Sequence, residues 1–168
     1  MNTQDTVQDL VERVRFSLRG LPSLNPGALV AHPGGHPNSD AWLLWHTGRE
    51  LDAQLAALSG ASEVWTTGGF RERFDLGEVG DNIGYGHTPE QARAVKVEDF
   101  SLLTGYVAAV LDAVSSYASG VDDWDEVVDT YESEPVTRQV RVTSLLLDAL
   151  EHLAQAHYVA GMPDLLSE

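Results

Sequence analysis

Apolar residues recur at helical spacing in several long segments of the chain, and turn-forming residues separate these segments. In residues 4–18 the apolar positions lie three or four apart, which predicts an amphipathic helix that ends at Gly20. Residues 20–38 hold four of the seven prolines and several glycines, so they are expected to form a loop. Residues 38–40 are all N-cap types, and a second helix is expected from there to about Leu58.

A long connection with little periodicity, residues 61–88, follows the second helix. Connections of this length are frequently functional. Thr88 then begins the pattern of a helix start, because Pro89 suits the first turn and Gln91 completes a capping box. The third helix is expected to run to about Ser119, with a break near Lys96 as an open alternative.

Residues 121–135 are acidic and are expected to form a second ordered loop, anchored by Trp124. The fourth helix is predicted to begin near Thr137 and to end at the Gly161-Met162-Pro163 stretch. Four long helices with little strand signal predict an all-α fold, a four-helix bundle with a long crossover between helices two and three. The chain contains no internal repeats, so we expect a single domain over residues 1–168.

Charge and composition narrow the classes of function. The chain has 26 acidic and 10 basic residues, a net charge of -16, which disfavours binding to nucleic acid or to an anionic membrane surface. No apolar run of membrane-spanning length and no signal peptide is recognised, so we expect no transmembrane helix and a cytoplasmic location. Cysteine is absent, so any metal must be held by His, Asp or Glu.

Two residues of the fourth helix, Asp148 and His152, are four apart and therefore lie on one helix face. A carboxylate beside an imidazole is half of a metal site, and His46 on the second helix is the best candidate for the other half. Such sites occur in the cores of helix bundles, and these donors suit zinc, nickel, iron or manganese. The alternative is that these residues belong to a polar stripe facing solvent.

The other candidate residues have weaker claims to a metal site. Glu50 lies four residues after His46 and could be a further ligand, but pairing with Arg49 or solvent is the favoured role. His157 points away from Asp148 and His152 and is assigned to the rim of the molecule or an interface. Three more histidines lie in connecting segments. His32 and His36 are expected to face solvent rather than bind a metal, and His87 is a candidate to orient a substrate.

The order of these segments resembles the DinB-like superfamily, in its actinobacterial branch related to the metal-binding domain of mycothiol-dependent maleylpyruvate isomerase. Four segments carry the resemblance: NSDAWLLWHTGRELDAQLAAL, EVWTTGGFRERFDL, GYGHTPEQ and DALEHLAQAHYVAGMP. Together they extend from about Asn38 to Pro163. The resemblance implies a four-helix bundle that binds a divalent metal through one residue of helix two and two residues of helix four.

Carried over to this chain, the implied metal ligands are His46, Asp148 and His152. The isomerase has Glu where this chain has Asp148, and it has a C-terminal domain with no counterpart here. The implied ion is divalent, most readily zinc or nickel. The implied activity is that of an S-transferase or isomerase that uses a low-molecular-weight thiol of the mycothiol type. Its partners would be the thiol, a small electrophile and a second copy of the chain.

Two hypotheses of function follow. In the first, the metal binds the thiol as a thiolate, which attacks an electrophile held under residues 61–88. Arg49, Tyr85 or His87 are candidates to orient that electrophile. In the second, the protein is a non-catalytic metal-binding or stress-related dimeric bundle, in which the metal is structural or absent. A closed coordination sphere would favour the second hypothesis, and an open position above a cleft would favour the first.

Overall fold

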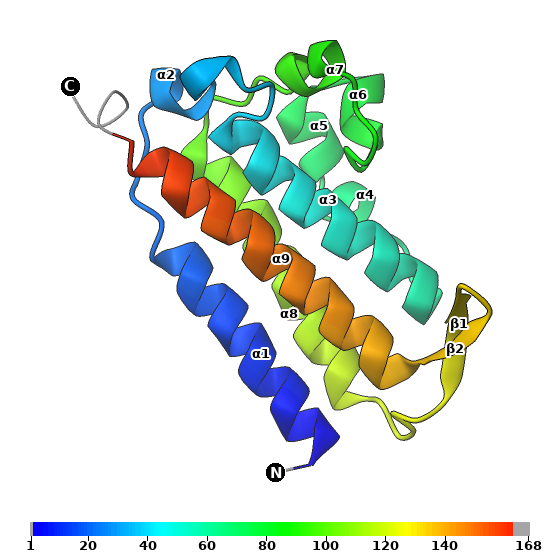
Figure 1. Cartoon of the computed structure of the whole chain (residues 1–168). Helices are drawn as coiled ribbons and strands as arrows, with labels where there is room; N and C mark the ends of the chain where they lie inside the picture. Colours follow the sequence, from blue (N-terminus) through cyan, green and yellow to red (C-terminus); the bar gives the residue numbers. More distant parts are fainter. Residues whose placement is uncertain (1, 163–168) are drawn as a thin grey trace.

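The computed structural model describes residues 2–162 and is predominantly helical (Figure 1). Four long helices, α1 (Thr3–Arg19), α3 (Asp40–Ser59), α8 (Phe100–Ser119) and α9 (Arg138–Ala160), pack side by side, and shorter helices cover one end. The prediction of an all-α fold is confirmed at this level.

The predicted helix starts depend on caps that the structure contains. Asn2 forms a capping box with Asp5 at the start of α1, and Ser39 accepts the backbone N–H of Trp42 at the start of α3. α1 turns an apolar stripe inward, formed by Val7, Val11, Val14 and Leu18. α3 ends at Gly60, whose φ of +73° is readily adopted only by glycine. Sequence and structure therefore agree on the first two long helices.

The segment predicted as a loop between α1 and α3 contains two short helices. They are α2 (Pro26–Leu29) and a 3₁₀ turn at Pro33–Gly35. Asn25 caps α2 by accepting the backbone N–H of Ala28, and Leu29 of this helix is completely buried. This segment therefore packs onto the long helices rather than extending into solvent.

The predicted crossover is also helical in part. It contains α4 (Val64–Thr67), α5 (Phe70–Phe74) and α6 (Glu78–Asp81). α4 lies beside the middle of α3, and α5 and α6 lie nearer the end of the molecule where α3 starts (Figure 1). The predicted capping box of Thr88 and Gln91 starts α7 (Pro89–Ala94). A break at residues 95–99 separates α7 from α8, so the alternative of a broken third helix is confirmed.

By length and composition alone, α8 is long and apolar enough to cross a membrane, which differs from the expectation that no apolar run of that length is present. Its fully buried residues include Leu103, Val107, Val110 and Leu111, and the helix contacts both α1 and α3. At the contact with α3, a Cβ on Gly48 would lie 2.5 Å from the ring of Tyr106. This contact packs α8 closely against α3.

The acidic segment before α9 contains a hairpin that the sequence did not predict. β1 (Val127–Tyr131) and β2 (Glu134–Thr137) pair antiparallel, with Tyr131 opposite Glu134. The hairpin extends from the end of the molecule opposite α6 and α7 (Figure 1). The strands escaped prediction because their side chains are mostly exposed, so no alternation of apolar and polar residues marks them.

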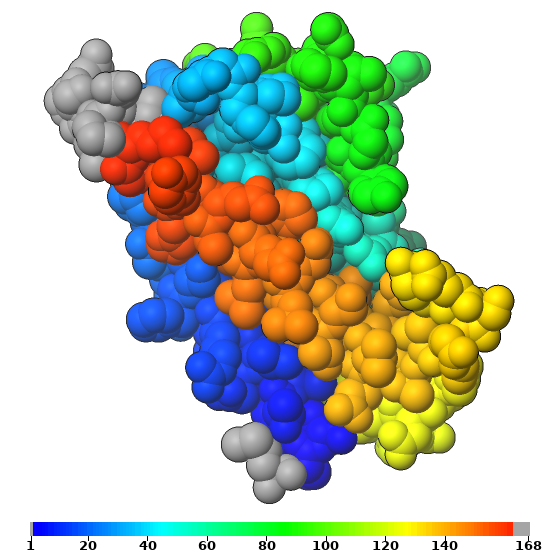
Figure 2. All heavy atoms as spheres, in the orientation of Figure 1, coloured from blue at the N-terminus to red at the C-terminus, as the bar shows by residue number. Residues whose placement is uncertain are grey.

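α9 runs between α1 and α3 across one face of the molecule (Figure 2). Thr137 caps its start through the backbone N–H of Val140, as predicted, and Gly161 caps its end. The predicted helix stop at Pro163 lies outside the described residues. Because α3 and α9 are antiparallel, residues early in α3 face residues late in α9 (Figure 1).

Candidate metal centre

His46 lies in the second turn of α3 and is 4% exposed. Its ring stacks on Trp42, with centroids 4.5 Å apart, and its Nδ1 bonds to the carbonyl oxygen of Ile83. A carbonyl oxygen only accepts, so Nδ1 carries the proton and Nε2 presents a lone pair. The surroundings therefore fix both the orientation and the tautomer of this imidazole.

Glu50 occupies the next turn of the same helix face. Its Oε2 lies 3.0 Å from Nε2 of His46, and its Oε1 accepts the side-chain amide of Gln54. Of the two roles expected for Glu50, pairing with Arg49 is wrong, because Arg49 pairs with Glu63 instead, and the Glu50 side chain is only 18% exposed to solvent. A carboxylate and an imidazole lone pair at this separation need a proton or a cation between them.

His152 completes the cluster from α9. Its ring meets that of His46 edge to face, with centroids 4.5 Å apart. Its Nδ1 lies 2.9 Å from the backbone oxygen of Asp148 and 3.3 Å from Oδ2 of the same residue. Nδ1 is therefore the donor, which leaves Nε2 as the free nitrogen. The contact with Asp148 raises the pKa of His152 and lowers that of the Asp148 carboxyl.

One donor atom from each of His46, Glu50 and His152 lies within 4.8 Å of the other two, so this group could hold a metal ion. Two imidazoles and a carboxylate form a donor set that suits zinc, nickel, iron or manganese. The structure thus brings two of the three predicted ligands together and adds Glu50. Asp148 lies beside His152, and its role as a ligand stays a prediction.

The segment after α6 covers His46. Gly84 has a φ of +92°, and a Cβ at this position would lie 2.7 Å from Nδ1 of His46. Nδ1 of His87 accepts the indole N–H of Trp42 at 3.2 Å, so Nε2 of His87 carries the proton. Within residues 2–162 that Nε2 is buried without a partner. Burial, and then the nearby His46, lower the pKa of His87.

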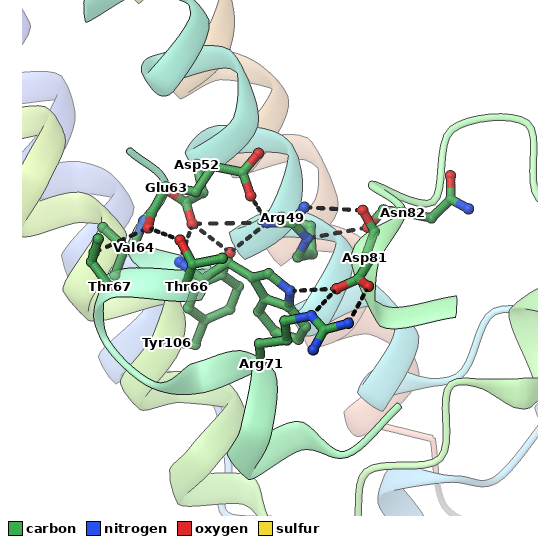
Figure 3. A network of polar contacts seen from close by, with 11 residues as sticks. Arg49, Asp52, Glu63, Val64, Thr66, Thr67, Arg71, Asp81, Asn82 and Tyr106 are labelled. Carbon is green, nitrogen blue, oxygen red and sulfur yellow. Dashed lines mark hydrogen bonds and ion pairs between the residues drawn. The ribbon is translucent and has the colours of Figure 1, made fainter. Parts of the chain in front are cut away.

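A buried network anchored on Arg49 holds this segment in place (Figure 3). Arg49, 2% exposed, donates to Glu63 at 2.8 Å and to the backbone oxygens of Asp81 and Asn82 at 3.3 and 3.1 Å. Charge-assisted hydrogen bonds of this kind are among the strong ones. Arg49 therefore acts as a clamp between α3 and the end of α6, and its donors are occupied by the protein itself.

Asp52 reinforces the clamp one turn further along α3 (Figure 3). It accepts the backbone N–H groups of Val64 and Trp65 at 2.8 and 2.7 Å and the hydroxyl of Tyr106 at 2.8 Å. Burial raises the pKa of both Asp52 and Tyr106. The sequence offered a signal for this network, because Arg49 and Asp52 lie three residues apart on a largely apolar helix, but it could not identify their partners.

The remaining histidines lie outside the cluster. Nε2 of His157 is 2.9 Å from the backbone oxygen of Ser17, so it fastens α9 to α1. His32 and His36 bond to their own loop, where Nδ1 of His36 accepts the backbone N–H of Asn38 at 3.1 Å. Tyr85, named as a candidate to orient a substrate, is 84% exposed.

Comparison with solved structures finds a relative of nearly the same length. The chain shares 33% sequence identity with a conserved protein from Enterococcus faecalis, over 94% of this chain and 92% of the other, with a TM-score of 0.75. The chain belongs to the same family as that protein. No protein-family model and no curated protein matches the chain. The family relationship thus covers both the long helices and the segments that surround the cluster.

Proposed function

We propose that this chain is a metal-dependent enzyme of the DinB-like superfamily, an S-transferase or isomerase that uses a low-molecular-weight thiol of the mycothiol type. The observation that carries the proposal is the cluster of His46, Glu50 and His152, contributed by two antiparallel helices. The packing of α1, α3, α8 and α9 supports a four-helix bundle of the DinB-like type.

Each residue of the cluster has a role in this proposal. His46 and His152 present their Nε2 atoms, and Glu50 or Asp148 supplies an anionic oxygen. A divalent ion bound by these donors would stabilise a thiol in its reactive thiolate form. Ile83 and Asp148 bond to the opposite nitrogens of the two imidazoles, which fixes the ligands in orientation.

The segment 78–88 gives the reaction a sheltered site. It covers His46 through Gly84, and the clamp of Arg49 holds it against α3. A covered site excludes water, which would compete with a thiol for an electrophile. We further propose that the protein works in the cytoplasm as a homodimer, with the thiol and a small electrophile as its partners.

The first test is metal content. Substitution of His152 by Ala removes one imidazole of three candidate donors, so we expect bound zinc or nickel to fall by at least about tenfold after dialysis, as measured by elemental analysis. His157→Ala is the matched control on the same helix, because His157 bonds to Ser17 outside the cluster. Equal metal content in the two variants would remove the proposal.

A second candidate function, a non-catalytic metal-binding or stress-related dimeric bundle, is favoured by one observation. Glu50 adds a protein donor to His46 and His152. If Asp148 binds as well, four protein ligands would close the coordination sphere, as is typical of structural metals. Cobalt substitution distinguishes the two. Addition of a thiol should change the visible spectrum of the cobalt protein if a coordination position is open, and should leave it unchanged if the sphere is closed.

A further inference from the structure

A cavity of about 510 Å³ lies between the start of α3, the end of α9 and the loop that precedes α3. This volume falls within the range of about 300–1,000 Å³ that is typical of small-molecule sites. Leu43, Ala154, Val159 and Met162 give it largely apolar walls.

The cavity adjoins the metal cluster. Leu43 lies one turn before His46 on α3, and Gln155 lies one turn after His152 on α9. Residues three or four apart share a helix face, and one turn advances about 5 Å. Because the two helices are antiparallel, both turns lead from the cluster towards the same end of the molecule (Figure 1). The cavity therefore begins about one helical turn from the two imidazoles.

The chemistry of the walls indicates what the cavity can hold. Among the described residues that line it, the polar side chains are neutral amide, hydroxyl and imidazole groups, and none is Asp, Glu, Lys or Arg; they belong to His36, Asn38, Gln155 and Tyr158. The residues outside the described range, 1 and 163–168, include no Lys or Arg. With a net charge of -16 on the chain, an anionic group would lose its hydration without gaining a counter-charge from these walls. Arg93, which reaches the same loop, donates to the backbone oxygen of Gly35.

We propose that this cavity binds the apolar, uncharged body of the small-molecule substrate, an aromatic or branched aliphatic group whose polar end is directed towards His46 and His152. The direction of the polar end towards His46 and His152 rests on the proposed function. The binding of the apolar body in the cavity does not depend on it. Tyr158 at the cavity offers a ring on which an aromatic ligand can stack. A polar thiol of the mycothiol type does not suit these walls, so it approaches the cluster from another side.

The test uses two fluorescent probes that differ by one sulfonate: neutral N-phenyl-1-naphthylamine and anionic 1-anilinonaphthalene-8-sulfonate. Both are titrated into the metal-free full-length protein, and binding is followed by the rise in fluorescence. We expect the neutral probe to bind at least about tenfold more tightly, since the sulfonate finds no cationic side chain. Equal affinities, or tighter binding of the sulfonate, would overturn the proposal.

Two tryptophan substitutions locate the neutral probe. Ala154 is exposed on α9 and lines the cavity, so Ala154→Trp should fill the space and weaken binding at least about tenfold. Ala57 is an exposed alanine of α3 that lines a different, smaller cavity near the hairpin, so Ala57→Trp should leave the affinity unchanged. Circular dichroism verifies that both variants keep the helical fold. Equal effects of the two substitutions would overturn the assignment.

Nickel links the cavity to the cluster. With Ni²⁺ added, the fluorescence of the bound neutral probe should be quenched in the wild type but not in His152→Ala. If Ala154→Trp and Ala57→Trp bind the neutral probe equally well while Ni²⁺ still binds, the cavity assignment alone is overturned. Binding of the neutral probe as expected without any binding of Ni²⁺ would instead overturn the metal-dependent function and leave the apolar site in place.

Discussion

Asp40 is a carboxyl group that the fold has buried almost completely. It is 1% exposed, and within residues 2–162 neither of its oxygens has a hydrogen-bond partner. Burial raises its pKa from 3.8 to about 7. Asp40 lies in the first turn of α3, at the positive end of the helix dipole, which favours the ionised carboxylate. The dipole therefore offsets part of the free-energy cost of burying this charge.

The raised pKa of Asp40 predicts a pH dependence of stability. The folded state binds the proton more tightly than the unfolded state, so the stabilisation is complete below about pH 3.8 and is lost as the pH rises to about 7. Asp40→Asn keeps the shape without the charge. Above pH 7 it should raise the free energy of unfolding by up to roughly 4 kcal/mol, at about 1.4 kcal/mol for each pKa unit.

Urea denaturation of wild type and Asp40→Asn from pH 4 to pH 8 measures this difference directly. Asp125→Asn is the control, because this carboxyl is exposed in the loop before the hairpin. The difference in the free energy of unfolding between Asp40→Asn and wild type should grow as the pH rises. For Asp125→Asn this difference should stay within about 0.5 kcal/mol at every pH. If the difference in unfolding free energy for Asp40→Asn stays constant from pH 4 to pH 8, Asp40 does not titrate in this range.

At the scale of elements, the contact between the segment 82–87 and α3 positions the first histidine of the cluster. Gly84→Ala would bring a methyl group 2.7 Å from Nδ1 of His46 and would break the bond to Ile83 or shift the segment. Disturbing the outer partner of a metal-binding histidine typically costs 10–100-fold in metal affinity. We therefore expect zinc affinity, measured by calorimetric titration, to fall by at least about tenfold.

Gly86→Ala separates this contact from backbone strain. Gly86 has a φ of +73°, so alanine is strained there as well, but no atom lies within 4 Å of its added Cβ. It should lower stability by about 1 kcal/mol without changing zinc affinity. Equal losses of affinity in the two variants would mean that strain in the segment, not the contact with His46, sets the affinity.

The sequence predicts those features whose interacting residues lie close together along the chain. The starts of α3, α7 and α9 are set by side chains three residues from the backbone groups they cap, so they were predicted. Gly84 and Ile83 act on His46 across 37 residues or more, and no local pattern marks such a contact. Glu50 carried the same four-residue signal as Asp148 and His152, but its neighbour Arg49 offered a competing partner.

The charge of the whole molecule acts against its compact state. The chain has 16 more acidic than basic side chains, and these negative charges repel one another in the folded state. Exposed ion pairs such as Arg71 with Asp81 and Arg13 with Asp9 each stabilise the fold by only about 0–1 kcal/mol. The attractions that hold the fold are the packing of the long helices and the buried clamp of Arg49, and neither weakens much with salt. The repulsion does weaken, because it acts between exposed charges at long range.

Stability should therefore rise with ionic strength. Between 0.02 and 0.3 M sodium chloride we expect the melting temperature to increase by roughly 2–5 °C, since a gain of about 1 kcal/mol corresponds to about 2–4 °C at this chain length. The measurement is made with a chelator present, so that ions at the cluster of His46 and His152 do not contribute. A melting temperature that falls with salt would mean that exposed ion pairs outweigh the repulsion, and the fold would then depend on its surface charges as well as on its apolar core.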